Sequence, residues 1–527
     1  MNDHAVLIGA LQQLLGQARV STQPDVLALA ASDLYSTGPA PVAVARPATP
    51  EAVAATVREA ALAGYAIVPR GGGLSYTGGY RCGADCAVLL DLTDLDKIED
   101  ISAEDMTITV QAGATWKQID AALAPLKLRL PFFGTFSGAG ATVGGGLSHG
   151  ALFFGSARYG SAADIALGLE VVTADGGLLK TGQWGLRVPS RPVFRNFGPD
   201  LTGLFLHDGG ALGIKTRAAL RLIRRPSAIT HASFQFDELG DAALALSEVA
   251  RAGIAEDVYV LEDASVGAVA RSKRSIRNVL ATAVAVARAA RGAFGAARDL
   301  AGIVLARPGS GSEGYGLHCT FAAGSRASAE AERAMARKIA LSFGGRQVEP
   351  VVPRVARASP FPDLEGTLDS DGRRWAAVNA KVAHSQGVSL IGQHRSLVDS
   401  HSTAMSECQV SVTYLLSALS NHSFSFEAVF HWNDAWLPSH RHFVSPGRLG
   451  RLREPEPNPA ARALVDRLRD ETVEMFRQFG AASNQIGRTY PYLEALDDAP
   501  AALVRAVKRE LDPRSLMNPG VLALGER

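Results

Sequence analysis

The chain has few cysteines, almost no net charge and no long apolar run. Four cysteines among 527 residues are too few for a disulfide framework, so we expect a reducing compartment. Lys and Arg total 53 and Asp and Glu total 52, so the net charge of +1 indicates no particular partner. No stretch of about 18 uncharged apolar residues occurs, and the first residues lack the pattern of a secretory signal. These absences predict a cytoplasmic protein that does not span a membrane.

The cysteines are also poorly arranged for a metal centre. Cys82 and Cys86 are separated by three residues rather than two, and no second pair answers them. Zinc and iron–sulfur sites usually draw on two closely spaced pairs. We therefore expect structural thiols and no metal site.

The order of helix-like and strand-like segments predicts an α+β fold in two domains. Helical periodicity covers 50–65 and 116–128, and strand patterns cover 65–69, 86–93, 106–113 and 165–173. We expect residues 1–225 to form the first domain, 226–455 a second domain with a sheet and covering helices, and 456–527 a mainly helical C-terminal segment.

Glycine is abundant, with 53 residues, and much of the excess lies in two runs. The first run, 68–80 (VPRGGGLSYTGGY), follows an apolar strand, and its glycines let backbone N–H groups approach an anion closely. Arg70 adds a positive charge, and Ser75, Tyr76 and Thr77 add hydroxyl donors. The run matches neither the P-loop nor the Rossmann fingerprint. We expect a phosphate-binding loop of another kind; the alternative is a glycine-rich surface turn.

The second run lies within residues 132–172, where small residues dominate from Gly134 to Gly150. Such a backbone is able to lie flat against a large planar ligand. Two loops of this kind in one strand-rich domain predict a dinucleotide bound in extended form.

These segments resemble, in order along the chain, the vanillyl-alcohol-oxidase type of FAD flavoproteins, which have a PCMH-type FAD-binding domain. The similar segments include PRGGGLSYTGGY, TITVQAGATWKQIDAAL, RYGSAADIALGLEVVTADG, DLTGLFLHDGGALGIKTRAALRL and LDPRSLMNPGVL, and with the glycine run they cover about half of the chain. The DLTGLF and LDPRSLMNPG segments are most similar to the glycolate oxidase and D-lactate dehydrogenase branch. The resemblance implies a two-part FAD-binding domain, a substrate (cap) domain and C-terminal helices that return to the flavin.

The resemblance also implies which residues bind FAD. Carried over residue by residue, they are Arg70, Gly71, Gly72, Gly73, Leu74, Ser75, Tyr76, Gly78, Gly134, Thr135, Ala141, Thr142, Gly144, Gly145, Ser148, Tyr159, Gly160, Gly213, Ile214 and Asn518.

Some members of the family bond FAD covalently, and two of their linkages are impossible here. Leu74 occupies the position of the linking histidine in the first run, and residues 131–146 contain no cysteine. A linkage through a histidine of the substrate domain stays open, with His394, His401, His422 and His431 available. We expect non-covalent FAD.

The chain departs from the hydroxy-acid branch where that branch binds its substrate or a metal. The strand SNHSFSFEAVFHWND holds His422, Glu427 and His431 without the branch's two-histidine spacing, and Asn484-Gln485 stands where a Glu-His pair is expected. A divalent metal and a simple lactate or glycolate substrate are therefore doubtful. Because residues two apart share a strand face, Glu427 and His431 should face one way and His422 the other.

Substrate oxidation needs an anchor for the substrate and a base for its proton. We predict Arg488 as the anchor and Tyr490 as a polar contact, with Glu427, His422 and His431 completing the catalytic candidates and a histidine as the base. The alternative for Arg488 is a salt bridge to the C-terminal helix, and for each histidine a structural role. Lys381 and Arg395 are further basic residues that no motif recommends.

A basic helical tract at 271–307 offers one candidate contact with a membrane surface. It holds eight Lys and Arg against one acid, Asp299, and few aromatics, which argues against nucleic acid. The alternatives are alanine-rich helices packed on the substrate domain, which we favour, and a lid.

Taken together, the sequence predicts an FAD-dependent oxidoreductase. It would move a hydride from an organic alcohol, 2-hydroxy acid or phenol to flavin N5 and pass electrons to oxygen, a quinone or a carrier protein. A homo-oligomer is one expected state. The alternatives are a flavin-free protein that kept the fold, and a synthase or reductase that uses FAD without net oxidation.

Overall fold

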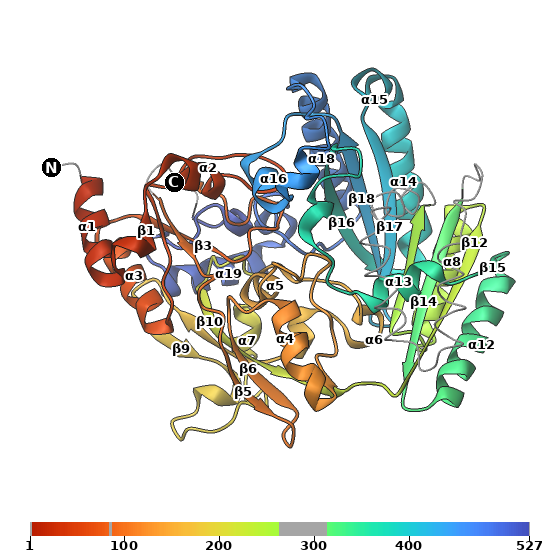
Figure 1. Cartoon of the computed structure of the whole chain (residues 1–527), viewed down its shortest axis with the longest axis horizontal. Helices are drawn as coiled ribbons and strands as arrows, with labels where there is room; N and C mark the ends of the chain where they lie inside the picture. The colour runs from red at the N-terminus through yellow and green to blue at the C-terminus, as the bar shows by residue number, and fades with distance from the viewer. Residues whose placement is uncertain (1–2, 84–86, 263–313, 526–527) are drawn as a thin grey trace.

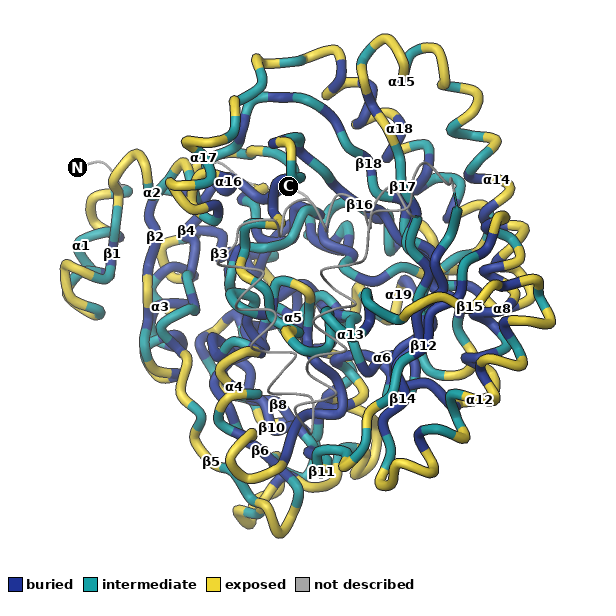
Figure 2. Tube along the Cα trace, turned by 45° about the vertical axis from the view of Figure 1, so that its right-hand side comes forward, coloured by how far each residue is buried: buried dark blue, intermediate teal, exposed yellow. Residues whose placement is uncertain are grey.

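The computed structural model describes residues 3–83, 87–262 and 314–525, and the basic tract 271–307 lies outside these ranges. In Figure 1 the first domain occupies the left of the molecule and the large cap sheet the right, with helix α5 (Val143–His149) between them. Both domains combine sheets with helices, so the predicted α+β class is confirmed. Figure 2 shows buried chain running through both domains, while exposed chain is concentrated on outer elements such as α14 (Gly387–Ser400) and α15 (Ser402–Cys408).

A four-stranded sheet in the order β1-β2-β4-β3 carries the first glycine run. Its strands are β1 (Val20–Ser21), β2 (Ala43–Ala45), β3 (Ala66–Arg70) and β4 (Ala87–Asp91), and its helices are α1 (Asp3–Leu15), α2 (Pro24–Ala30) and α3 (Pro50–Leu62). The predicted helix at 50–65 begins where Thr49 caps it and Pro50 opens it, and β3 delivers the chain directly into the glycines.

A five-stranded antiparallel sheet in the order β5-β6-β10-β8-β9 carries the second run. Its strands are β5 (Ile98–Ser102), β6 (Thr107–Gln111), β8 (Ala166–Val172), β9 (Leu178–Lys180) and β10 (Ile214–Arg221). The other elements here are α4 (Trp116–Leu123), α6 (Ser156–Tyr159), α7 (Leu201–Leu204) and the two-stranded pair β7 (Leu128–Arg129) with β11 (Ile223–Arg224).

The cap domain is a seven-stranded antiparallel sheet in the order β15-β12-β14-β13-β17-β18-β16. The strands are β12 (Ala228–Phe236), β13 (Asp257–Glu262), β14 (Tyr315–Ala323), β15 (Arg346–Val348), β16 (Arg374–Ala383), β17 (Ser411–Leu419) and β18 (Ser423–Trp432). The predicted boundary at 225/226 falls between β11 and β12.

The helices of the second half are α8 (Leu239–Arg251), α12 (Arg326–Ser342), α13 (Val351–Ala358), α14, α15, α16 (Pro438–Phe443), α17 (Pro446–Leu449), α18 (Pro459–Gln478) and α19 (Asp498–Leu511). Of these, α14 and α18 pack on β18 at one end of the cap sheet, and α8 and α12 cover β12 and β14 at the other. The first helix of the predicted C-terminal segment, α18, thus covers the cap sheet.

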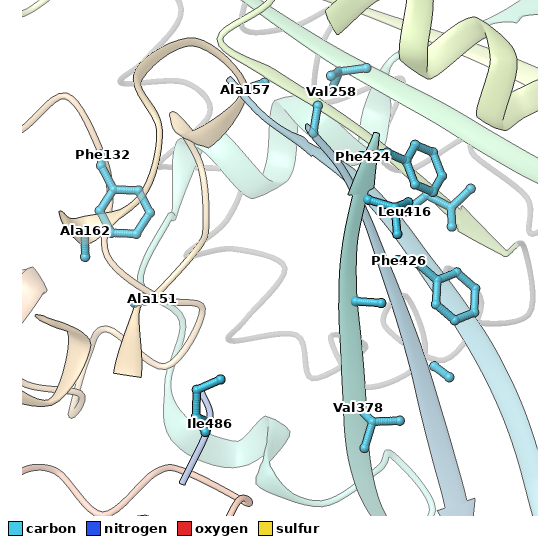
Figure 3. Close-up of a cluster of buried hydrophobic side chains, with 14 of the residues drawn as sticks. Phe132, Ala151, Ala157, Ala162, Val258, Val378, Leu416, Phe424, Phe426 and Ile486 are labelled. Carbon is cyan, nitrogen blue, oxygen red and sulfur yellow. The ribbon is translucent and has the colours of Figure 1, made fainter. Parts of the chain in front are cut away.

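The cap strands β16 and β18 follow the two-residue period of a sheet with two different faces. Even-numbered residues of β18, such as Phe424 and Phe426, are buried in the apolar core, whereas Glu427 and His431 lie on the opposite face and are half-buried. Figure 3 shows Phe424 and Phe426 on one side of these strands and Ala151 and Ile486 of the first half and the C-terminal loop on the other.

The C-terminal tail returns to the first sheet after α19. Met517 lies beside Ile67 of β3 as an isolated parallel bridge, in which Ile67 N–H donates to Leu516 O and Asn518 N–H donates to Ile67 O. The tail therefore extends the sheet that carries the first glycine run, at the strand edge where that run begins.

Candidate functional site

The two glycine runs, far apart along the chain, pack against each other. A Cβ atom on Gly71 would stand 2.3 Å from Thr142 Oγ1, and one on Gly72 would stand 2.1 Å from Gly140 O. Neither distance is possible for a real side chain, so glycine is required at both positions. We call this junction of residues 70–79 with residues 138–149 the glycine seam.

Part of the second run is helical rather than flat. Residues 143–149 form helix α5, with Thr142 Oγ1 accepting the Gly145 N–H at 3.3 Å and Gly150 ending the helix at φ +68°. Ala112 packs against Gly144 and the Trp116 ring packs against Gly146, which leaves no space for a side chain at either glycine. The expectation of a flat backbone through the whole run was wrong for this segment.

The first run presents a positive, donor-rich backbone. The N–H groups of residues 71–76 donate no hydrogen bond to the residues that the structure describes. Arg70 is 8% exposed, and within the described ranges no carboxylate lies within 4.0 Å of its guanidinium, whose hydrogen bond is to Leu29 O at 3.4 Å. A buried cation without a carboxylate and a row of free amides suit a phosphate or pyrophosphate group.

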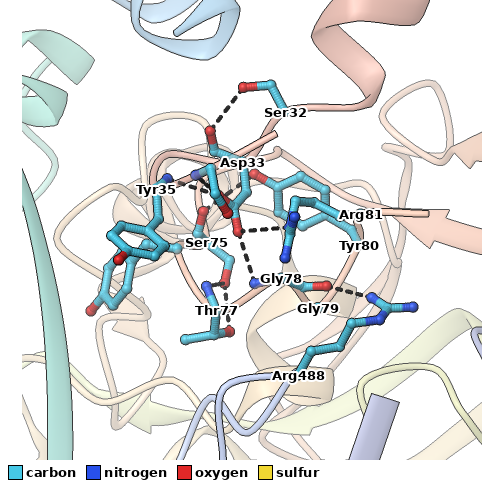
Figure 4. Close-up of polar contacts among 12 residues, drawn as sticks. Ser32, Asp33, Tyr35, Ser75, Thr77, Gly78, Gly79, Tyr80, Arg81 and Arg488 are labelled. Carbon is cyan, nitrogen blue, oxygen red and sulfur yellow. Dashed lines mark hydrogen bonds and ion pairs between the residues drawn. The ribbon is translucent and has the colours of Figure 1, made fainter. Parts of the chain in front are cut away.

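A buried carboxylate, which the sequence did not reveal, fixes the shape of this loop (Figure 4). Asp33 is fully buried, and its carboxylate accepts the N–H groups of Tyr35 and Ser36 at 2.7 Å and of Gly78 at 2.8 Å. Tyr80 Oη donates to Gly73 O at 2.7 Å. The bond from Gly78 to Asp33 crosses from the glycine run to the loop after α2, and the others hold each segment, so the loop is shaped before any ligand binds.

The C-terminal tail also holds the first run in place through hydrogen bonds. Asn518 is fully buried, and its Nδ2 donates to Gly79 O and to Gly209 O, each at 2.7 Å. The predicted cofactor residue Asn518 thus ties the first run to the loop before β10, as the expected return of the tail to the flavin requires.

The cap sheet meets the seam through β16 and β18. The Trp375 ring lies edge-on to the Tyr76 ring, with centroids 5.5 Å apart. On the same face, Asn379 lies opposite Glu427 and Lys381 lies opposite Ser425. We call the side chains of Asn379, Lys381, Ser425, Glu427 and His431 the cap wall.

A C-terminal loop connects the cap wall to α5. Asn484 N–H donates to Asn379 Oδ1 at 3.2 Å, and Asn484 Nδ2 donates to Gly150 O at 2.9 Å. Asn484 Oδ1 and His149 Nδ1 are buried without a hydrogen-bond partner among the described residues. Burial lowers the pKa of His149 to about 4, so this ring is neutral at pH 7. Two unsatisfied polar atoms beside a glycine seam are expected where a ligand completes the site.

The predicted anchor Arg488 lies in the seam but binds backbone. Its guanidinium donates to the carbonyls of Gly78 and Pro519 and, at 3.3 Å, to Asn518 Oδ1. Burial, with the nearby charge of Arg81, lowers its pKa to about 10. This arrangement joins the tail to the first run and is not the salt bridge to the C-terminal helix that we had set beside it. The predicted contact Tyr490 is buried and accepts the Asn379 N–H at 2.7 Å.

The histidines divide between the two sides of the cap sheet. His431 lies on the cap wall, where Nδ1 pairs with Asp369 Oδ2 at 2.7 Å and Nε2 with Thr413 Oγ1 at 2.9 Å. His422 lies before β18 in an exposed turn, so the structure does not bring this candidate base to the wall. His394 is buried beside Thr472 of α18, and His401 pairs with Glu471 of α18. Of the four histidines considered for a covalent bond, His431 is the one on the wall.

The remaining predicted cofactor residues lie at several places in the first domain. The Gly134 backbone, at φ +84°, lies against the Trp116 ring, Thr135 pairs with Ser137, and Ser148 O accepts the Gly209 N–H. Gly160 adopts φ +84° beside Asp164, and the half-buried Tyr159 ring lies 5.8 Å from the Arg129 guanidinium. Leu74 and Ala141 lie at the seam, and Gly213 and Ile214 are buried where β10 begins.

A buried ionic cluster holds the cap against the first domain. Arg129 of β7 pairs with Glu256 at 2.5 Å, and Arg357 of α13 pairs with Glu256 at 2.7 Å and with Asp257 at 2.9 Å. Asp257 also accepts the Gly155 N–H at 2.7 Å. All four side chains are at most 5% exposed, so removing one of them would leave a buried charge without its partner.

Two classes of feature do not occur in the described parts of the chain. Across residues 3–83, 87–262 and 314–525 there is no group of three His, Cys, Asp or Glu placed to hold a metal. In the same ranges, no helix combines the length and the apolar character needed to cross a membrane.

Comparison with protein families places two domains on this chain. Residues 41–182 match the FAD binding domain, and residues 487–522 match the C-terminal domain of FAD linked oxidases. The first match contains the whole glycine seam, and the second contains Arg488, Tyr490 and Asn518.

Curated relatives match about two fifths of the chain. The chain is 31% identical over 192 residues to D-lactate dehydrogenase [cytochrome] 1, mitochondrial, of Saccharomyces cerevisiae, covering 36% of this chain and 31% of that one. It is 33% identical over 228 residues to D-2-hydroxyglutarate dehydrogenase of Xanthomonas citri, covering 43% and 46%. The matches thus span about a third to a half of the relatives' length.

Solved structures share the whole fold at low identity. The 4-ethylphenol oxidase of Gulosibacter chungangensis has a TM-score of 0.69 at 16% identity, covering 99% of this chain and 97% of that one. A p-cresol methylhydroxylase has a TM-score of 0.68 with the same identity and coverage. An alkyldihydroxyacetonephosphate synthase has a TM-score of 0.67 at 15% identity, covering 98% and 86%.

The residues fit the cofactor that these matches name, since the seam has room for backbone but not for side chains and offers amides and Arg70 to a pyrophosphate. The resemblance seen in the sequence is therefore confirmed: the chain has the FAD-binding and C-terminal domains of the FAD-linked oxidases, in the fold of the PCMH-type flavoproteins, with FAD as its cofactor.

Proposed function

We propose that this chain is an FAD-dependent oxidoreductase that oxidises an organic alcohol, a 2-hydroxy acid or a phenol. The observation that carries the proposal is the position of the cap wall, with ionisable side chains, directly beside a glycine seam suited to FAD. Bound FAD would supply the hydride acceptor of the reaction. The residues of the chain would hold the substrate and take its proton.

The seam would hold the cofactor without a covalent bond. Arg70 and the free amides of residues 71–76 would bind the pyrophosphate, and residues 138–146 would lie against the rest of the molecule. Two of the three linkages that the family resemblance implies lack the required residue: Leu74 is aliphatic, and residues 131–146 contain no cysteine.

Glu427 is the proton acceptor that the cap wall favours. Burial raises the pKa of its carboxyl, although the charge of Lys381 opposes the rise. A carboxylate with a raised pKa is a better general base near neutral pH than an exposed one. His431 is less suited, because both of its ring nitrogens already have partners on Asp369 and Thr413.

The test is flavin reduction in the absence of oxygen. The purified protein is loaded with FAD, freed of excess cofactor and mixed anaerobically with a panel of alcohols, 2-hydroxy acids and phenols. The proposal expects one class to bleach the visible flavin band. Retained FAD that no class bleaches would contradict it and favour a synthase or reductase, and a failure to retain FAD would favour a flavin-free protein. Reoxidation of the bleached protein by oxygen then separates an oxidase from a dehydrogenase that needs a quinone or a carrier protein.

A further inference from the structure

Lys381 and Glu427 face each other on the cap wall without forming an ion pair. Lys381 Nζ donates to Asn379 Oδ1 at 2.8 Å, and in the described parts of the chain no carboxylate oxygen lies within 4.0 Å of it. The Glu427 carboxylate accepts no hydrogen bond from the described residues. Since Glu427 lies opposite Asn379 and Lys381 opposite Ser425, the two charged side chains are diagonal neighbours on one face.

Each group lies in an environment that disfavours its charge. Burial lowers the pKa of Lys381 to about 7, although the charge of Glu427 opposes the fall. Burial also raises the pKa of Glu427. Both side chains nevertheless remain partly accessible, so a small group has access to them. A donor and an acceptor are thus held apart in a region from which most water is excluded.

The other titratable groups near the pair are two tyrosines and a histidine. Tyr76 and Tyr490 lie near Glu427, His207 lies near Lys381, and Arg469 lies near the two tyrosines. Burial lowers the pKa of His207, which keeps its ring neutral at pH 7, and Arg469 donates to two backbone carbonyls. Lys381 and Glu427 thus bring one positive and one negative charge to this part of the wall, and these offset each other.

We propose that Lys381 and Glu427 together bind the hydroxyl group of an uncharged alcohol, and that this wall selects against 2-hydroxy acids. The proposal rests on the proposed function and specifies its substrate. Lys381 would donate a hydrogen bond to the hydroxyl oxygen while the Glu427 carboxylate accepts the hydroxyl proton. A substrate carboxylate would meet a lysine and a glutamate whose charges offset each other, and its burial beside Glu427 would be costly.

The chemical step balances with groups already named. The substrate O–H bond would break with its proton passing to Glu427, and bound FAD would supply the two-electron acceptor for the hydride released from the C–H bond. The substrate C–O bond becomes a carbonyl. Lys381 keeps its hydrogen bond to this oxygen throughout, so it is a catalytic residue by contact rather than by proton transfer.

The first test measures the ionisation of Lys381 without any turnover. The protein is labelled with an amine-reactive anhydride at pH 5 to 11, and the modification of each lysine is followed by peptide mass spectrometry. We expect Lys381 to titrate with a midpoint near pH 7, about three units below the ordinary lysine value. In Glu427→Gln the midpoint should fall further, because burial remains while the favourable carboxylate charge is lost. A midpoint at the ordinary lysine value, or one that is unchanged in Glu427→Gln, would overturn the pairing.

The second test compares two probes that differ by one carboxylate, benzyl alcohol and mandelate. With FAD-loaded protein, benzyl alcohol should slow the labelling of Lys381 about threefold or more, and mandelate at the same concentration should not. Equal or better protection by mandelate, or protection by neither probe, would overturn the inference. Failure of the proposed function shows differently, as loss of FAD or as a flavin band that no substrate bleaches. Lys338→Met serves as the matched control, and near-ultraviolet circular dichroism checks that Lys381→Met and Glu427→Gln are folded.

Discussion

The glycine seam is made of backbone, whereas the cap wall is made of side chains that strands β16 and β18 bring together. In the seam, close backbone packing requires glycine, since a Cβ on Gly72 would stand 2.1 Å from Gly140 O. On the wall, the strand backbone accepts many residues, and what matters is the charge of the side chains, since Lys381 and Glu427 do not form an ion pair. We infer that cofactor binding depends on the seam and substrate selection on the wall, so that mutations can change the two separately.

Among substitutions that distinguish the wall from the seam, Glu427→Gln should have the largest effect. Loss of the proton acceptor should slow flavin reduction by about 10²- to 10⁴-fold, while FAD affinity stays within about twofold because the seam is unchanged. Stopped-flow reduction with the substrate found in the panel, together with FAD titration, measures both quantities. His431→Gln is the comparison on the same strand and face, and a larger rate loss there would transfer the role of base to the histidine.

Arg357→Met tests whether seam and wall depend on one rigid junction. The change leaves Asp257 buried without its cation and Glu256 with Arg129 alone, so the free energy of unfolding should fall by about 3–5 kcal/mol. Arg346→Met, which removes an exposed pair with Asp237, should cost less than about 1 kcal/mol in the same denaturant titration. Equal losses in the two variants would show that the buried cluster does not join the domains.

Gly72→Ala changes the packing of the seam and leaves the cap wall as it is. Inserting one methyl group against Gly140 O should lower FAD affinity by about tenfold to a hundredfold, in line with about 1–3 kcal/mol for overpacking. Gly392→Ala is the matched control, because a Cβ there meets nothing within 4 Å and glycine disfavours its helix, α14. Fluorescence titration of the two variants with FAD makes the comparison, and similar affinities would refute the packing argument.

Thr142→Ala is the smallest test of the seam. It removes the side-chain cap of α5 and should cost about 1 kcal/mol of stability with a measurable loss of FAD affinity. Thr49→Ala removes the equivalent cap of α3, away from the seam, so it should cost a similar amount and leave FAD affinity unchanged. Thermal unfolding with and without FAD separates the two effects; the same ligand-dependent shift in both variants would contradict a role for α5 in the site.

Much of the fold and of the seam was predictable, because their signals are local. Helix α3 has its cap and its periodicity in consecutive residues, and the residues of the first run that approach an anion adjoin one another. The resemblance of whole segments then located the FAD-binding residues in order along the chain. The helix inside the second run was missed because glycine weakens helical propensity, and packing against Trp116 overrides that weakness.

The wall was harder to predict, because its residues meet only in the folded chain. The two-residue period placed Glu427 and His431 on one face, but nothing near Lys381 in the sequence indicates that it lies diagonal to Glu427. Asp33 was missed for the same reason, since its partner Gly78 is 45 residues away. Arg488 looked like a substrate anchor from its neighbours, yet its partners are backbone carbonyls that pattern alone does not reveal.

A crystal structure of the FAD-loaded protein would show whether FAD binds in the glycine seam. We expect the pyrophosphate within hydrogen-bond distance of the amides of residues 71–76 and of Arg70, with the flavin ring between α5 and the cap wall. A pyrophosphate bound elsewhere, with Arg70 still facing Leu29 O and the amides of residues 71–76 still free, would contradict it.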